Sequence, residues 1–170
     1  MIACSHSPRA GELSGPWDQA FWFTVPGPWA SKSNFRRNRR GGRNAWQVAA
    51  SFQQQVTLLA RIALPEGWEL GPPPPAPVSQ RPAIVAFIYA DSLLDVPNLD
   101  KSALDGLERV VFHTDAVVRA SLCMGSRNRG DGTISIARIP PTSGHATILS
   151  AMQELAVQTL VAFGEEGLAR

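Results

Sequence analysis

Hydrophobic residues along this chain follow two patterns, one typical of helices and one typical of strands. Together these patterns predict the order of its secondary-structure elements. Apolar side chains at every third or fourth position from Trp46 to Ala63 predict an amphipathic helix that begins near Asn44 and ends before Pro65. The same spacing predicts helices over residues 98–111 and 149–163. Shorter apolar runs predict strands over residues 21–25, 83–90, 117–124 and 133–139. The resulting order, β-α-β-α-β-β-α, predicts an α/β (α+β) fold with a single mixed β-sheet and helices packed on it.

The segments between these elements carry their own signals. Residues 1–19 lack periodicity and are expected to form a flexible N-terminal tail ahead of one domain, residues 20–170. Residues 125–132 contain an Asp-Gly turn, which predicts that the last two strands form a hairpin. Seven of the 14 prolines lie in residues 65–82, which are therefore expected to form an extended surface insertion. Such a segment is more often a tolerated insertion than a docking site for a proline-recognising partner, although both interpretations stay open.

Length and composition narrow the class of protein. A chain of 170 residues with 44% hydrophobic and 18% charged residues has the size and balance of one globular domain. Its longest apolar run, residues 83–90, is far shorter than the roughly 20 residues that cross a bilayer. The first twenty residues show no secretory signal, so a cytoplasmic protein without a membrane partner is expected. Two cysteines and three scattered histidines have neither disulfide-framework nor zinc-site spacing.

The charge is unevenly distributed, although the net charge is only +2. Six cations lie within residues 32–43, a stretch that contains no acid. They are Lys32, Arg36, Arg37, Arg39, Arg40 and Arg43. A basic loop of this density is suited to binding the phosphates of a nucleic acid, although an arginine run is also often a solvated surface.

Acidic residues gather in the second half of the chain. Asn98, Lys101 and Asp105 share one polar face of the helix predicted there. If the strand that begins at residue 117 pairs beside the strand that ends at residue 90, Asp95 and Asp115 are expected to converge at one end of the sheet. Five aspartates lie within twenty-five residues: Asp91, Asp95, Asp100, Asp105 and Asp115.

Converging carboxylates favour a divalent ion with oxygen ligands, Mg²⁺ or Mn²⁺. Such an ion activates water for attack on a phosphodiester, and Lys101 is placed to stabilise the charge that develops on the phosphoryl group. An acidic metal site beside a basic loop is the combination that a metal-dependent nuclease needs. The simpler alternative is that each aspartate caps a helix or lies on the surface, with Lys101 and Asp105 forming an ion pair worth roughly 0.3 kcal/mol.

The sequence DVPNLDKSALDGL (residues 95–107), followed by DAVV (residues 115–118), resembles the signature of the RusA family of Holliday junction resolvases. That signature consists of D-x-D-N-x-x-K, an apolar helix containing D-A-L, and a D-D pair just before a strand. The order of elements is also similar, as is the PWASKSN lead-in to the basic loop (residues 28–34). The resemblance runs from residue 21 to residue 139 and leaves out the proline-rich insertion and the final helix.

The resemblance implies roles for individual residues. Asp95 matches the first metal-binding aspartate and Asp115 the late one, while Lys101 matches the catalytic lysine. Asn98 matches the motif asparagine. Asp105 matches the aspartate of D-A-L, for which a structural role and a role in positioning the site are equally open.

Two residues depart from the signature. Pro97 stands in place of its second aspartate, and Thr114 in place of the first acid of the D-D pair. Either Asp91 or Asp100 supplies the missing metal ligand, or this chain is an inactive member of the family. The alternatives are therefore an active nuclease and a catalytically silent protein that binds DNA junctions.

The resemblance implies a homodimeric, Mg²⁺-dependent endodeoxyribonuclease that acts in DNA recombination and repair. It would cut branched DNA, such as a four-way junction, with its twofold symmetry matched to that of the junction. Contacts between the basic loop and phosphates would dominate affinity. A third hypothesis, from another class, is an adaptor whose proline-rich segment and last helix bind other proteins.

Overall fold

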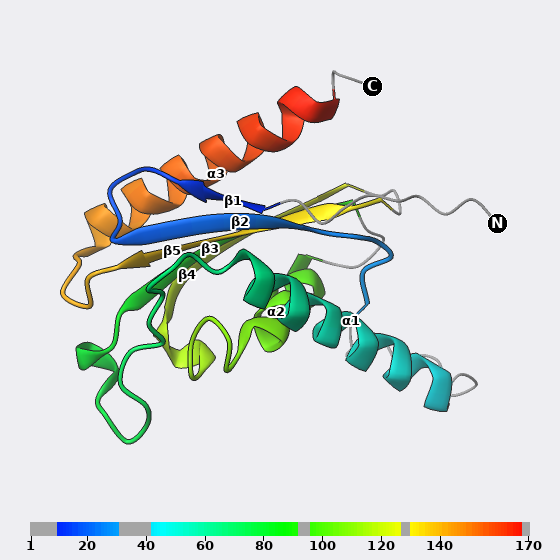
Figure 1. The fold of residues 1–170 in the computed structure, drawn as a ribbon, viewed down its shortest axis with the longest axis horizontal. Helices are drawn as coiled ribbons and strands as arrows, with labels where there is room; N and C mark the ends of the chain where they lie inside the picture. Colours follow the sequence, from blue (N-terminus) through cyan, green and yellow to red (C-terminus); the bar gives the residue numbers. More distant parts are fainter. Residues whose placement is uncertain (1–9, 31–41, 92–95, 127–129, 168–170) are drawn as a thin grey trace.

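The computed structural model describes residues 10–30, 42–91, 96–126 and 130–167, and these residues form one mixed sheet of five strands with long helices on both faces (Figure 1). The expected fold class is confirmed. Neighbouring strands follow the order β1-β2-β5-β3-β4. The strands are β1 (Ala10–Leu13), β2 (Gln19–Val25), β3 (Ala83–Asp91), β4 (Val118–Ser126) and β5 (Gly132–Ile139). The long helices of the described part are α1 (Gly42–Ala63), α2 (Val96–Leu107) and α3 (His145–Gly167).

The sheet separates two apolar cores. Helices α1 and α2 cover one face, and α3 covers the other (Figure 1). Side chains of β3 alternate between them: Ile84 and Ile88 pack in the core under α1 and α2, while Val85 and Phe87 pack under α3. Because both of its faces are buried, β3 reads in the sequence as a continuous apolar run.

The predicted hairpin of the last two strands is wrong. Strand β4 pairs with β3 in parallel, and β5 pairs with β3 on its other side, antiparallel, so β3 lies between them. A helix that connects two strands normally places the second parallel to the first, as α2 does for β3 and β4. The Asp-Gly turn reverses the chain direction, but it does not determine which strand becomes the neighbour.

The predicted N-terminal tail also needs a correction. Residues 10–13 form β1, which pairs antiparallel with β2, and the Trp17 indole donates a hydrogen bond to the Leu13 carbonyl oxygen at 3.2 Å. Four residues at the edge of a sheet are too few to show periodicity. Residues 1–9 lie outside the described part of the chain.

Helix boundaries differ from the sequence pattern by several residues. Helix α2 begins at Val96 and ends at Leu107, rather than running over residues 98–111. Its start includes Pro97, because the first turn of a helix does not need the backbone N–H that proline lacks. Helices α1 and α3 begin at Gly42 and His145, earlier than expected.

The proline-rich connection between α1 and β3 is anchored at one aromatic side chain. The rings of Trp68 and Phe21 pack edge to face at a centroid distance of 5.0 Å, and the Trp68 indole donates to the Val111 carbonyl oxygen at 3.0 Å. A ring nitrogen of His113 lies 3.1 Å from the Gly71 carbonyl oxygen. Residues 72–75 are exposed. The segment is therefore tied to the core through Trp68, with its proline run on the surface.

Candidate functional site

One end of the sheet gathers segments that are far apart in the sequence. Val25, at the end of β2, lies opposite Gly132, the first residue of β5, and Gly132 lies opposite Ala90 near the end of β3. Ala90 in turn lies opposite Gly125 near the end of β4. The final residue of β3, Asp91, is therefore at the same end of the sheet as the end of β2. The chain after β2 continues to residues 32–43, which carry the six cations and are called the basic segment below.

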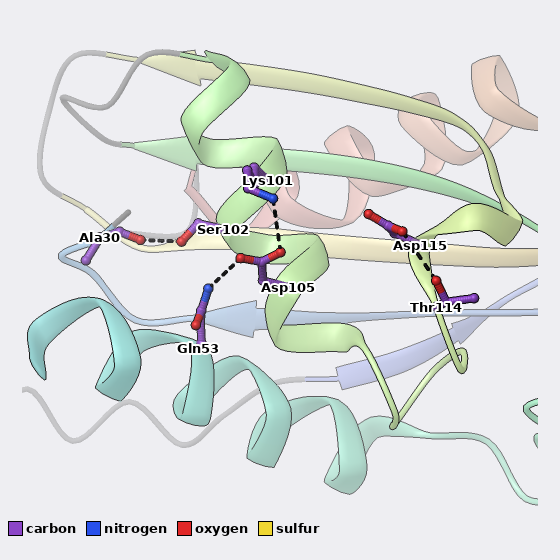
Figure 2. Close-up of polar contacts among 7 residues, drawn as sticks. All are labelled: Ala30, Gln53, Lys101, Ser102, Asp105, Thr114 and Asp115. Atoms are coloured by element: carbon purple, nitrogen blue, oxygen red, sulfur yellow. Dashed lines mark hydrogen bonds and ion pairs between the residues drawn. The ribbon is translucent and has the colours of Figure 1, made fainter. Parts of the chain in front are cut away.

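The start of the basic segment is fixed against α2. The Ser102 hydroxyl donates a hydrogen bond to the Ala30 carbonyl oxygen (Figure 2), and Ser102 is buried in α2. Trp29 is buried beside Phe52 of α1, with a centroid distance of 5.1 Å. A Cβ at Gly132 would lie 2.5 Å from the Trp29 ring, so the strand admits the indole because it has glycine there. These contacts hold the chain next to Lys101 at the point where residues 32–43 follow.

All six predicted DNA-binding cations follow Ala30 in the sequence. Lys32, Arg36, Arg37, Arg39 and Arg40 lie outside the described residues, and so does the side chain of Arg43. The described residues on either side of this stretch are Ala30, which contacts α2, and Gly42, the first residue of α1.

Lys101 and Asp105 form the ion pair that their spacing predicts. The Lys101 ammonium lies 3.5 Å from Asp105 Oδ1, on the exposed side of α2. The Gln53 side-chain amide donates to Asp105 Oδ2 at 2.9 Å (Figure 2). The Thr57 hydroxyl donates to the Gly106 carbonyl oxygen at 2.7 Å. Asp105 is thus held from two helices and orients Lys101. Asn98 is half-buried in the first turn of the same helix.

Asp100 points away from this pair, toward β4. The Ser121 hydroxyl donates to Asp100 Oδ2 at 3.1 Å, and the other carboxylate oxygen is buried with no hydrogen-bond partner. Burial raises the pKa of Asp100, and the hydrogen bond from Ser121 lowers it by less. Burial, together with the nearby Asp100 carboxylate, also raises the pKa of the Cys123 thiol to about 12. Asp100 is therefore placed between α2 and β4 rather than on the polar face.

Asp115 lies in a 3-10 turn, Asp115–Val117, just before β4, and its Oδ1 lies 3.4 Å from the Thr114 hydroxyl. Strand β4 does pair beside β3, as the sequence analysis supposed, but the two run parallel. Val118 therefore lies opposite Ile84, and Asp91 lies opposite Ser126. Along β3, Ile84 and Asp91 are seven residues apart, so at about 3.3 Å per residue these two pairs are separated by about 23 Å. Within one chain, Asp115 and Asp91 are at opposite ends of the strand pair.

The described residues do not form a metal-ligand set on their own. Among them, no group of three or more His, Cys, Asp or Glu side chains is close enough to hold an ion. Asp95, which immediately precedes α2, and the side chain of Asp91 lie outside the described part. Of the predicted acids whose side chains are described, Asp105 holds Lys101, Asp100 faces Ser121, and Asp115 is at the far end of β4.

Sequence reasoning missed the side chains that build this end of the molecule. Ser102 and Gln53 each interrupt an apolar helix face, which is the signal that could have identified them as buried or bridging polar groups. Trp29 gave no such signal, because its packing partners, Phe52 and Gly132, are distant in the sequence.

No protein-family model matches the chain, and no curated protein matches it. None of the described helices is long and apolar enough to span a membrane.

Proposed function

We propose that this protein is a structure-selective endonuclease that hydrolyses phosphodiesters in branched DNA, as the RusA resemblance implies. The observation that supports the proposal best is the hydrogen bond from Ser102 to Ala30. It ties the start of a segment with six cations to the helix that carries Lys101 and Asp105.

The arrangement suits a polyanionic substrate. Arginines of the basic segment would bind the backbone phosphates, which supply most of the affinity in binding that reads shape rather than sequence. Lys101 is exposed beside the origin of that segment and is oriented by Asp105. A positioned cation of this kind stabilises the negative charge that develops on a phosphoryl group during hydrolysis.

The proposal includes Mg²⁺, with Mn²⁺ as a substitute. Asp91 ends β3 and Asp95 precedes α2, so these two acids flank the same short connection. When bound, such an ion activates water and neutralises phosphate charge.

The second candidate is a protein that binds junctions without cutting them. Pro97 is exposed in the first turn of α2, where the RusA signature has an aspartate. The backbone there accommodates proline as a helix start, so the change removes a carboxylate without altering the element. This candidate predicts that Pro97→Asp creates or strongly increases cleavage.

A labelled four-way junction distinguishes the two candidates. We expect the wild-type protein to cut it in Mg²⁺, and Lys101→Ala or Asp95→Asn to reduce the cleavage rate at least about 100-fold. Lys101→Ala removes the cation that would stabilise the phosphoryl charge, and Asp95→Asn removes a charged ligand of the proposed metal ion. Arg61→Ala is the matched control, since Arg61 is an exposed cation in the last turn of α1. Binding is measured separately in EDTA.

The pattern of results assigns the function. Binding without cleavage in any divalent metal would favour the silent junction binder. Cleavage that is unchanged in both variants would remove Lys101 and Asp95 from the mechanism. A wild-type protein that neither binds nor cuts the junction at low salt would refute both candidates.

A further inference from the structure

Lys101 and Asp105 form their ion pair in the order that a helix favours less. An acid that precedes its cation by one turn pairs better than a cation that precedes its acid, and here the lysine comes first. The Lys101 side chain is also 68% exposed. By itself, an exposed pair of this kind contributes little and does not hold a long side chain in one orientation. The orientation of Lys101 therefore depends on what else contacts Asp105.

The second contact to Asp105 comes from Gln53, midway along α1. Its amide nitrogen donates to Asp105 Oδ2 at 2.9 Å, and the other carboxylate oxygen, Oδ1, lies 3.5 Å from the Lys101 ammonium. In Figure 2 the two dashed contacts lead from Gln53 on α1, through Asp105, to Lys101 on α2. Because a carboxylate is planar, a donor that fixes one oxygen from a neighbouring helix limits the directions open to the other oxygen.

A glutamine is chemically suited to this position. Its neutral amide donates a hydrogen bond without balancing the negative charge, so the carboxylate keeps its full charge for Lys101. An arginine or lysine in place of Gln53 would compete with Lys101 for the same oxygens. The residues next to it on the surface of α1, Phe52 and Val56, are buried and apolar. The amide is thus the polar group that this face of α1 directs at the carboxylate.

We infer that Gln53 is a positioning residue for phosphodiester hydrolysis: through Asp105 it holds the Lys101 ammonium where negative charge develops on the phosphoryl group. The role in hydrolysis rests on the proposed nuclease function, whereas the orientation of Lys101 by Gln53 does not. Helix α1 begins at Gly42, within the basic segment. One helix would therefore carry the end of the phosphate-binding segment and a determinant of the lysine's position.

Thr57 provides a matched comparison, one turn further along α1. Its hydroxyl donates to the Gly106 carbonyl oxygen at 2.7 Å, so it joins the same two helices at a backbone atom instead of at the carboxylate. A hydrogen bond that only packs α1 on α2 should matter as much at Thr57 as at Gln53. A positioning role should be lost with Gln53 and kept without Thr57.

The orientation of Lys101 is measured in the absence of DNA. The chain has only two lysines, Lys32 and Lys101, so ¹³C labelling of lysine Cε in a Lys32→Arg parent leaves one NMR signal. We expect two resolved Hε shifts in the parent, because a held side chain places these protons in different surroundings. Gln53→Ala should merge them, and Thr57→Val should not. A single shift in the parent, two shifts kept in Gln53→Ala, or merged shifts in Thr57→Val would each overturn the inference.

The role in hydrolysis is measured by single-turnover cleavage of a four-way junction in Mg²⁺. We expect Gln53→Ala to reduce the rate about 10-fold, because a misplaced catalytic group acts poorly, with affinity for the junction in EDTA unchanged. Thr57→Val should keep the rate, even where it costs more stability in urea. In an Asp105→Ala background, Gln53→Ala should cause no further loss, since the residue it acts through is already gone.

Two results would overturn the role in hydrolysis. An unchanged rate in Gln53→Ala would show that cleavage does not need this contact. An equal loss in the Asp105→Ala background would show that Gln53 acts by another route. If the wild type cuts no junction, the nuclease proposal itself fails, and the NMR signal still decides whether Gln53 orients Lys101.

Discussion

At the scale of single residues, Asp100 illustrates how tertiary packing sets the chemistry of a carboxylate. Its position in the sequence fits a surface acid or a metal ligand, but the side chain is turned into the contact between α2 and β4. One oxygen accepts from Ser121, and the other has no partner. The charged form therefore lacks solvation that it would have in water, and this raises the pKa of Asp100.

This raised pKa predicts a pH dependence of stability. Between the ordinary value of 3.8 and the raised pKa, the folded protein binds the Asp100 proton more tightly than the unfolded chain does. The contribution of Asp100 to the free energy of unfolding is thus fully present below 3.8 and is lost as the pH rises through the raised pKa. Asp100→Asn should lack this loss, so its stability relative to wild type should increase across that interval and level off above it.

Urea denaturation of both proteins from pH 3.5 to 7 measures the difference. Ser121→Ala serves as the second variant, because it removes the hydrogen bond that lowers the pKa of Asp100 and should widen the interval. A stability of Asp100→Asn relative to wild type that decreases with pH would contradict the assignment of burial as the main cause.

At the scale of elements, the packing of α1 on α2 depends on a glycine. A Cβ at Gly106 would lie 2.8 Å from the Cβ of Val56, closer than packed atoms approach, and 3.1 Å from the Gln53 carbonyl oxygen. The close approach lets Thr57 donate to the Gly106 carbonyl oxygen and lets Gln53 reach Asp105.

Gly106→Ala should force α1 and α2 apart. We expect a loss of about 1–3 kcal/mol in the free energy of unfolding, the usual cost of adding a methyl group to a filled interface, despite the better helix propensity of alanine. Urea denaturation with a two-state analysis measures it. Gln54→Ala, on the exposed side of α1, should change stability by less than about 0.5 kcal/mol. Equal stability of the two variants would show that the helix contact relaxes freely.

At the scale of the whole molecule, positive charge is concentrated in one stretch of the sequence, although the net charge is only +2. Six cations lie within residues 32–43, and Ala30, shortly before them, accepts a hydrogen bond from Ser102, the neighbour of Lys101 in α2. The salt dependence of DNA binding should therefore reflect the number of cations in this one segment.

The expected salt dependence follows from the number of cations. If all six bind phosphates on duplex arms, the logarithm of affinity should fall against the logarithm of salt concentration with a slope near −5 per subunit. Fluorescence anisotropy of a labelled junction in EDTA, over 50 to 300 mM salt, measures this slope. Replacing Arg36, Arg37 and Arg39 with glutamine should reduce its magnitude by about 3. A wild-type slope close to −1 would exclude the basic segment as the main anchor.

Local signals were sufficient to predict the three long helices and four of the five strands of the described part. The three-to-four-residue spacing predicted α1, and the apolar runs predicted β3 and β5, because burial against a core imposes these periods wherever the neighbours come from. The polar face of α2 likewise predicted the ion pair between Lys101 and Asp105, whose partners are one turn apart. The edge strand β1 was missed because four half-buried residues do not establish a period.

The sequence by itself determined most of the segments that are helices or strands, where the charges are concentrated, and which residues pair within one helix. All of these depend on residues that are near one another along the chain. Only the tertiary structure decided that β5 lies on the far side of β3 and that β4 runs parallel to it, which places Asp115 and Asp91 at opposite ends. Strand order and direction depend on contacts between distant segments, for which a periodic pattern carries no information.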